Sequence, residues 1–207
     1  MAIKPILFVD FDGTICLERY WRSLPESEHE GIQKLLFRND TTMVHDWMRG
    51  RYTAEEVNQY AAEKLGLDYD YLWAIFVDDC KTMHVSKDLL ERIKALSSSY
   101  TTILITGNMD SFSRFTAPAL SLEDYFDEIS NSHYEGRHKT DDNGQLFGKF
   151  TEKFGVPITD CILLDDSDSV CTLFNQLGGT AMQVSAAVPV EQHLETLENH
   201  RSPSHSA

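Results

Sequence analysis

Short apolar runs recur along the chain, and each ends at polar residues. The first run, residues 6–9, is rich in β-branched and aromatic types, which favours a strand buried on both faces of a sheet. Runs at residues 101–106 and 161–164 predict two more buried strands, and weaker ones predict strands at 126–130 and 180–184. Helical periodicity separates these runs at residues 86–97, 110–120, 145–154 and 170–177. The alternation predicts an α/β fold with a doubly wound parallel sheet.

The chain between the first two strong strands has a different pattern. Residues 28–36, 42–48, 53–65 and 69–81 read as helices, and a structureless loop of this length is improbable in a compact domain. We therefore expect an inserted α-helical cap at residues 17–82, lying over the carboxyl ends of the strands. The rest of the predicted organisation is an α/β core of residues 1–16 and 83–199 and a disordered polar tail of residues 200–207.

Two details support the helical reading of the insert. Thr53 followed by Glu56 is a helix-start pattern, and Gly66 is a typical helix stop. The three tryptophans all lie in the insert, and we interpret them as core aromatics of the helical bundle rather than as ligand contacts.

Composition excludes several classes of function. The chain has 207 residues with 42% hydrophobic and 25% charged residues, as in an ordinary globular protein. It contains no apolar run long enough to span a membrane and no signal-peptide pattern, so we expect a cytoplasmic protein without a membrane partner. The formal net charge of −15 argues against a nucleic-acid partner. The four cysteines lack metal-site or redox spacing and are expected to be reduced, and the oligomeric state stays open.

Polar side chains follow each strong strand. Asp10 and Asp12 follow the first strand, Thr106 ends the second, and Asp165 and Asp166 follow the third. Because open α/β sheets bind ligands at the carboxyl ends of their strands, these groups should converge on one site. Adjacent carboxylates raise each other's pKa unless a cation lies between them, and Mg²⁺ prefers oxygen ligands. A capped Asp-Gly surface turn is the alternative for the first pair alone.

Other residues extend this cluster. Lys139 precedes the third strong strand in a polar loop, and Gly107 follows Thr106 in a turn. Carboxylates, a hydroxyl group, a lysine and glycine-flanked backbone amides together suit a phosphoryl group bound with Mg²⁺. The sequence thus predicts a phosphoryl-binding site with Mg²⁺ as its cofactor.

The motifs resemble those of the haloacid dehalogenase (HAD) superfamily over nearly the whole chain. LFVDFDGT is similar to the first family motif, ILITGN to the second, Lys139 to the lysine of the third and LLDDSDS to the acidic fourth. A helical insert between the first and second motifs resembles the cap of the subfamily that includes β-phosphoglucomutase and many sugar-phosphate phosphatases.

The resemblance implies a role for each matching residue. Asp10 would be the nucleophile that forms an aspartyl-phosphate, and Asp12 would protonate the leaving alcohol and later deprotonate water. Mg²⁺ would be held by the Asp10 carboxylate, the Asp12 carbonyl and Asp166, with Asp165 close by. Phosphoryl oxygens would be held by Thr106, the amides of Gly107 and Asn108, and Lys139.

Some assignments stay open. Thr140 stands where many relatives have proline, so Lys149 and Lys153 are rivals of Lys139. The fourth motif begins Asp-Asp, which leaves open which of the two acids binds the metal directly, although we favour Asp166.

The function expected from this resemblance is a Mg²⁺-dependent phosphomonoesterase of the HAD type, acting on a small phosphorylated metabolite. The alternatives are a phosphomutase on the same core and a catalytically retired domain that binds a phosphorylated ligand. Selectivity should come from the cap, where Arg49 and Arg51 are candidate substrate contacts, and His133 and His138 near Lys139 are weaker candidates.

Overall fold

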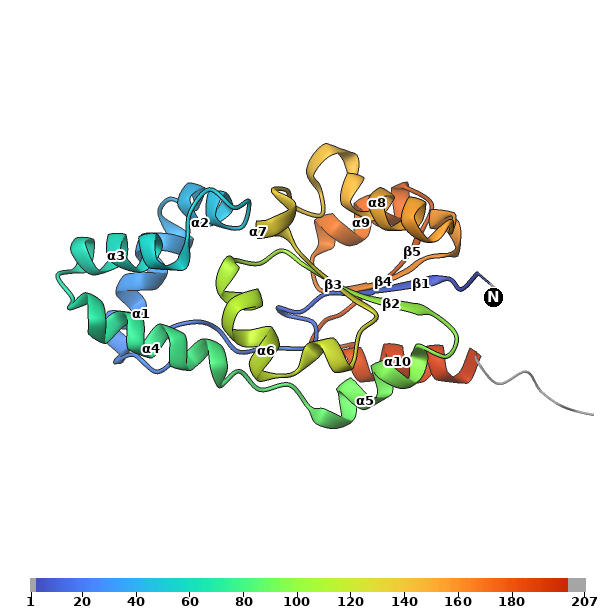
Figure 1. Cartoon of the computed structure of the whole chain (residues 1–207), viewed down its shortest axis with the longest axis horizontal. Coiled ribbons are helices and arrows are strands. Elements are labelled where there is room, and N and C mark those ends of the chain that lie inside the picture. Colours follow the sequence, from blue (N-terminus) through green and yellow to red (C-terminus); the bar gives the residue numbers. More distant parts are fainter. Residues whose placement is uncertain (1–2, 201–207) are drawn as a thin grey trace, which may run out of the picture.

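The computed structural model describes residues 3–200 and has two lobes, one helical and one α/β (Figure 1). The helical lobe, here called the cap, is formed by α1 (Glu26–Ile32), the π-helical turn η1 (Gln33–Arg38), α2 (Thr42–Trp47), α3 (Ala54–Leu65) and α4 (Tyr69–Lys81). All of these elements lie between the first and second strands, where the sequence predicts helices. Within the part of the chain that is described, no helix combines the length and the apolar character needed to cross a membrane.

A parallel sheet forms the centre of the α/β lobe. Among residues 3–200 it has five strands in the order β3-β2-β1-β4-β5, all paired in parallel. The strands are β1 (Ile6–Val9), β2 (Thr101–Thr106), β3 (Glu128–Asn131), β4 (Ile162–Asp165) and β5 (Thr180–Gln183). This architecture confirms the predicted doubly wound parallel sheet.

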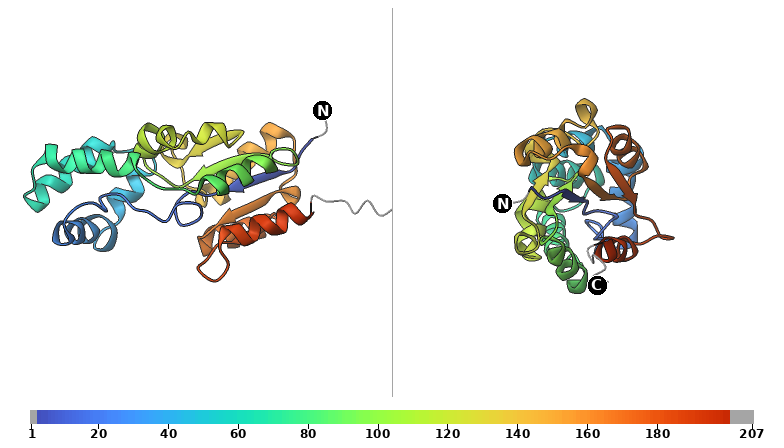
Figure 2. Two further views of the ribbon diagram at one scale, coloured as in Figure 1. Left: turned by 90° about the horizontal axis from the view of Figure 1, so that it is seen from below. Right: turned by 90° about the vertical axis from the view of Figure 1, so that its right-hand side faces the viewer.

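The strand register decides where the polar strand ends meet. Val9 at the end of β1 lies beside Leu104 of β2 on one side and Leu164 of β4 on the other. The residues that follow these positions, among them Asp10 and Asp165, therefore lie at one edge of the sheet. β1 starts at the end of the molecule far from the cap and runs toward it, so this edge faces the cap (Figures 1 and 2).

Helices cover both faces of the sheet. Helices α5 (Lys87–Leu96) and α10 (Val190–His200) lie on one face, and α8 (Gln145–Phe154) and α9 (Asp168–Gln176) on the other (Figure 1). The strand β1 is fully buried, and its alternating side chains divide between two hydrophobic clusters. The central strand thus anchors both layers of the core.

The sequence reading differs from the structure in two helical regions. The helix α10 was not predicted, although Val190, Leu194 and Leu197 are buried at helical spacing. His200, assigned from the sequence to the disordered tail, ends this helix, and the rest of that tail lies outside the described residues. The helix predicted at 110–120 is present at residues 110–119, but its middle is a π-helical turn, η2 (Phe112–Thr116), which leads into the short α6 (Ala117–Ala119).

The start of α3 follows the predicted pattern. Thr53 Oγ1 accepts a hydrogen bond from the Glu56 amide at 3.3 Å, and Glu56 Oε2 accepts one from the Thr53 amide at 2.7 Å. Gly66 ends the helix in the left-handed conformation, with φ of 67°. Both ends of α3 are therefore specified locally by the sequence.

The cap and the α/β lobe share one hydrophobic cluster. Trp21, Trp47 and Phe76 on the cap side are fully buried in the same cluster as Val9 of β1 and Phe112 of η2. Its rings are in contact: the centroids of Trp21 and Phe76 are 4.7 Å apart. The cap is therefore packed against the core through apolar side chains rather than joined only by its two connecting segments.

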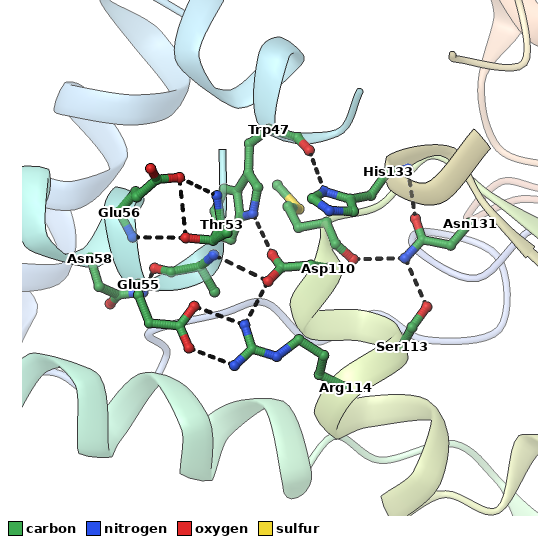
Figure 3. A network of polar contacts seen from close by, with 12 residues as sticks. Trp47, Thr53, Glu55, Glu56, Asn58, Asp110, Ser113, Arg114, Asn131 and His133 are labelled. Atoms are coloured by element: carbon green, nitrogen blue, oxygen red, sulfur yellow. Dashed lines mark hydrogen bonds and ion pairs between the residues drawn. The ribbon is translucent and has the colours of Figure 1, made fainter. Parts of the chain in front are cut away.

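A buried carboxylate adds a polar junction between the two lobes (Figure 3). Asp110 Oδ1 accepts a hydrogen bond from Trp47 Nε1 at 2.6 Å, while Oδ2 accepts one from the Ala54 amide at 3.2 Å. Arg114 donates to Asp110 Oδ2 at 2.7 Å and forms a two-pronged ion pair with Glu55 of the cap. Asp110 thus fixes the end of α2 and the start of α3 over the carboxyl edge of the sheet.

Replacing Asp110 by alanine is expected to lower the free energy of unfolding by roughly 2–4 kcal/mol, because three donors lose their acceptor in a buried place. Urea denaturation followed by tryptophan fluorescence measures this. Asp124→Ala, at an exposed acid of the same lobe, is the control and should leave the midpoint nearly unchanged. Equal midpoints for the two variants would contradict the role of Asp110 in holding the cap.

Candidate active site

A buried lysine lies between two carboxylates at the carboxyl edge of the sheet. Lys139 Nζ is 2.9 Å from Asp10 Oδ1 and 2.5 Å from Asp165 Oδ2. Asp10 follows β1 directly, Asp165 ends β4, and Lys139 enters from the loop after the short helix α7 (Ser132–Glu135). All three side chains are almost completely buried. The structure therefore brings together these three residues, which the sequence predicted for one site.

Several polar atoms of this cluster retain hydrogen-bonding capacity. The contact of Asp10 Oδ1 with Lys139 is an ion pair by distance but lacks hydrogen-bond alignment. Among the described residues, no hydrogen-bond partner meets Asp10 Oδ1 or the hydroxyl groups of Thr14 and Thr106. Buried polar groups are normally paired, so unpaired atoms facing the same edge are a sign of a ligand site.

Burial and charge shift the titration of these groups. Burial raises the pKa of Asp10 above its ordinary value, with Lys139 opposing and Asp165 adding to the effect. Burial alone lowers the pKa of Lys139, but its two carboxylate neighbours outweigh it and the pKa is raised. Lys139 is therefore a permanent positive charge in the cluster, where it can attract an anion.

Asp12 is held by a side chain whose role the sequence reading missed. Asn108 Nδ2 donates a hydrogen bond to Asp12 Oδ2 at 2.6 Å, and Asn108 is fully buried. The Asn108 oxygen accepts from Tyr20 Oη at 2.6 Å and from the Met109 amide at 2.9 Å. With its oxygen engaged twice, Asn108 can present only its amino group to Asp12.

The sequence prediction used only the backbone amide of Asn108. The amide in fact donates to Ser132 Oγ at 3.0 Å. A polar residue after a strand-end threonine signals a site residue, but nothing local in the sequence connects its side chain to Asp12.

Partial burial raises the pKa of Asp12. Arg19, 3.9 Å away, and the side-chain amide of Asn108 oppose this shift.

Three carboxylates form a candidate metal centre. Oxygen atoms of Asp10, Asp165 and Asp166 all lie within 4.8 Å of one another. Asp165 is engaged on both sides, because Oδ1 accepts from the Ser167 amide at 2.9 Å and Oδ2 pairs with Lys139. Asp166 is more exposed than the other two. Clustered carboxylates, one of which has an oxygen that accepts no hydrogen bond, fit a hard divalent cation such as Mg²⁺.

Gly13 allows the turn after β1 to approach these acids. Its φ is +80°, and a Cβ atom built on it would lie 2.2 Å from Asp166 Oδ2. Any other residue would thus be strained in its backbone and would displace Asp166.

A cavity of about 360 Å³ lies between the cap and this cluster. Asp12, Gly107 and Asp166 line it on the core side, and it is completed by Arg19, Tyr20, Gln33, Phe37, Met48 and Met109. His138 lies behind Gly107, with its Nδ1 atom 3.2 Å from the place of a Cβ on that glycine. Burial lowers the pKa of His138 to about 4, with Arg49 adding to the effect, so this imidazole is neutral at pH 7.

The other basic residues considered from the sequence lie elsewhere. Lys149 and Lys153 are on the exposed side of α8, where they pair with Glu135 and Glu128. That leaves Lys139 as the lysine placed within the acidic cluster.

Arg49 and Arg51, the cap arginines expected from the sequence to contact substrate, are both engaged by acids. Arg49 forms a two-pronged ion pair with Asp141 at 2.8 Å for each contact, and Arg51 pairs with Asp46 at 2.6 Å. Neither arginine is among the residues that line the cavity. His133 Nδ1 donates a hydrogen bond to the Trp47 carbonyl, 2.8 Å away, and thereby contacts the end of α2 (Figure 3).

Several solved structures share this fold. The HAD family enzyme BT-2542 of Bacteroides thetaiotaomicron, solved in complex with magnesium and inorganic phosphate, matches with a TM-score of 0.66 and 18% identity over 88% of this chain and 95% of that one. A predicted HAD-like family hydrolase from Porphyromonas gingivalis gives a TM-score of 0.65 and 15% identity over 98% and 100% of the two chains. The 2-haloacid dehalogenase of Pseudomonas syringae pv. Tomato DC3000 gives 0.64 and 16% over 95% and 99%.

A search of curated proteins found no match. The structural similarities, all of low identity, support the fold. A family profile described as haloacid dehalogenase-like hydrolase matches residues 5–169, a range that includes every acid of the cluster and Lys139. Because this match covers most of the chain, the chain belongs to the haloacid dehalogenase-like hydrolase family.

Proposed function

We propose that this protein is a Mg²⁺-dependent phosphomonoesterase that hydrolyses a small phosphate ester through an aspartyl-phosphate. The observation that carries the proposal is a second carboxylate: Asp12 is held by Asn108 and lines the cavity beside the buried pair of Asp10 and Lys139. An alkoxide leaving group needs a proton, and Asp12 is placed to give one. A halide ion leaves without a proton, so dehalogenation has no use for this acid.

In the proposed reaction each residue has a separate task. The Asp10 carboxylate attacks phosphorus, the bond from phosphorus to the ester oxygen breaks, and Asp12 gives its proton to the departing oxygen. Asp12 then takes a proton from water, whose oxygen attacks the phosphorus of the aspartyl-phosphate, and the bond from phosphorus to the Asp10 oxygen breaks. Inorganic phosphate leaves, and both carboxyl groups return to their starting states.

The cations of the site make this attack possible. Two anions must approach each other when a carboxylate attacks a phosphate, so positive charge has to lie beside both. Lys139 supplies it next to Asp10, and the unpaired Thr106 hydroxyl can donate to a phosphoryl oxygen. Mg²⁺, held by Asp10, the Asp12 carbonyl and Asp166, would neutralise further phosphoryl charge.

Two wider assignments accompany the proposal. The position of the cap between β1 and β2 supports grouping the chain with the helically capped subfamily that includes β-phosphoglucomutase. We also infer a cytoplasmic location, since Cys16, Cys80, Cys161 and Cys171 are buried free thiols.

The test of the function is phosphate release from 4-nitrophenyl phosphate by the purified protein with Mg²⁺ and with excess EDTA. We expect turnover with Mg²⁺, loss with EDTA and recovery when Mg²⁺ is restored. Halide release from 2-chloropropionate is measured in parallel and should be absent. Halide release without phosphate release would replace the phosphatase by a dehalogenase, and inactivity in both assays would indicate a retired domain.

The two neighbouring acids of the fourth motif should behave differently when each is replaced by asparagine. Asp166→Asn is expected to weaken Mg²⁺ binding by at least about tenfold, because losing even an outer-shell partner of a metal site costs about 10–100-fold. Stability should stay nearly unchanged, because Asp166 is exposed. Asp165→Asn should instead destabilise the fold, because both oxygens of this buried acid are engaged by protein groups. Calorimetric titration with Mg²⁺ and urea denaturation of both variants measure the difference. The reverse pattern would assign direct metal binding to Asp165.

A further inference from the structure

The cavity between the cap and the core is placed to receive the alcohol part of a phosphate ester. Its core side is formed by Asp12, which would protonate that alcohol, together with Gly107 and Asp166. A phosphoryl group bound beside Asp10 and Lys139 would therefore direct its ester oxygen into this cavity. The residues on the remaining walls then decide which alcohols fit.

Those walls are mainly apolar. Phe37 of the π-helical turn η1, Met48 at the end of α2, Met109 after β2 and the ring of Tyr20 provide hydrocarbon and sulfur surface. Methionine side chains adapt to the shape of an apolar ligand without offering strong hydrogen bonds. The apolar part of a ligand would pack favourably against these side chains.

Few polar groups of the walls remain available to a ligand. The Tyr20 hydroxyl donates to Asn108 at 2.6 Å, and the Met48 carbonyl accepts from Ser132 Oγ at 2.7 Å. This leaves the side chains of Gln33 and Arg19, of which Gln33 Nε2 also lies 3.3 Å from His29 Nε2. The cavity can thus pair one or two polar groups of a ligand, but not hydroxyls all around a ring.

We propose that the substrate is the phosphate monoester of a compact, mainly apolar alcohol, with at most one or two polar groups, and that polyhydroxylated sugar phosphates are poor substrates. This inference rests on the proposed phosphatase function and adds the substrate class. A hydroxyl placed against Phe37, Met48 or Met109 gives up its hydrogen bonds to water without replacement. An apolar pocket rejects an isostere with one added hydroxyl by about 10²-fold.

A matched pair of substrates tests the inference. Cyclohexylmethyl phosphate, like glucose 6-phosphate, has a six-membered ring that carries the phosphate on an exocyclic methylene. Its ring is all carbon and has no hydroxyl groups. Both leave as primary alkoxides, so their demand for a proton from Asp12 is similar. We expect kcat/KM for cyclohexylmethyl phosphate to exceed that for glucose 6-phosphate by at least about 10²-fold. An equal or reversed ranking overturns the inference.

Two methionine variants connect the ranking to the cavity. Met48→Gln keeps the length of an unbranched side chain but adds hydrogen-bonding groups, and should reduce the preference at least roughly tenfold. Met43→Gln is the control, because Met43 is a half-buried methionine of α2, the helix that Met48 directly follows, and does not line the cavity. It should keep the wild-type preference. Circular dichroism confirms folding of both variants, and an equal effect of the two substitutions would contradict the role of the cavity wall.

The design separates this inference from the proposed function. If the wild type hydrolyses 4-nitrophenyl phosphate but prefers glucose 6-phosphate, the function stands and the substrate class is wrong. If no ester is hydrolysed, the proposed function is wrong. The affinities of cyclohexylmethyl phosphate and glucose 6-phosphate for the Asp10→Asn variant, measured by calorimetry, then still rank the two esters. Tighter binding of cyclohexylmethyl phosphate is the expected result, and equal or weaker binding overturns the proposed selectivity.

Discussion

Replacing Asp10 by asparagine is expected to abolish phosphate release while leaving the protein folded. The amide is nearly isosteric with the carboxylate, so the buried end of β1 keeps its packing. A neutral amide is a poor nucleophile towards phosphorus and a weak metal ligand, however. The expected loss in kcat is roughly 10⁶-fold, the scale observed when a covalent nucleophile is removed from an enzyme.

Two measurements make this prediction specific. Urea denaturation should show a cooperative transition for Asp10→Asn, because Lys139 keeps its ion pair with Asp165. Asp70→Asn, at an exposed acid on α4, is the matched control and should retain wild-type turnover. Turnover of Asp10→Asn close to that of the control would remove Asp10 from the role of nucleophile.

The strands could be predicted because their signal is local. The five segments expected from apolar runs all form strands, and 101–106 has the predicted bounds. A strand buried on both faces needs a continuous apolar run, which few other structures in a globular protein tolerate. The helices α4 and α8 also have the predicted bounds. Asp68 caps the start of α4, and Gly155 in the left-handed conformation ends α8.

The features that were missed depend on contacts distant in sequence. The π-helical turn η2 lies where α4 of the cap packs on the core, and η1 lies within the cap beside α1 and α2. The pattern of a regular helix cannot show such widening. The helix α10 has a helical apolar pattern, but the sequence reading assigned residues 190–199 to the core without predicting an element there. Its burial results from packing against α5, which the sequence does not show.

The sequence could predict the part of the candidate site that follows from strand order, but not the part that depends on contacts distant in sequence. Asp10, Thr106 and Asp165 could be grouped because parallel strands bring their carboxyl ends to one edge. The tie from Tyr20 through Asn108 to Asp12 joins three segments, and no spacing rule predicts it. The pairing of Arg49 with Asp141 likewise depends on how the cap lies on the core, so the sequence could suggest a substrate contact where the structure has an ion pair.

Replacing Asp12 by asparagine is expected to slow turnover of alkyl phosphates by roughly 10²- to 10⁴-fold, the usual contribution of a positioned acid–base group. The side-chain oxygen of asparagine at this position can still accept the hydrogen bond from Asn108, but its amide has no acidic proton to give to an alkoxide. Aryl phosphates need little protonation because their leaving groups are stable anions, so the first chemical step should be impaired much less for them. Single-turnover measurements with benzyl phosphate and 4-nitrophenyl phosphate on the wild type and on Asp12→Asn separate these cases. If the substitution slows the first step equally for both esters, Asp12 acts as a structural or metal-positioning group, and the acid must be sought elsewhere in the cavity.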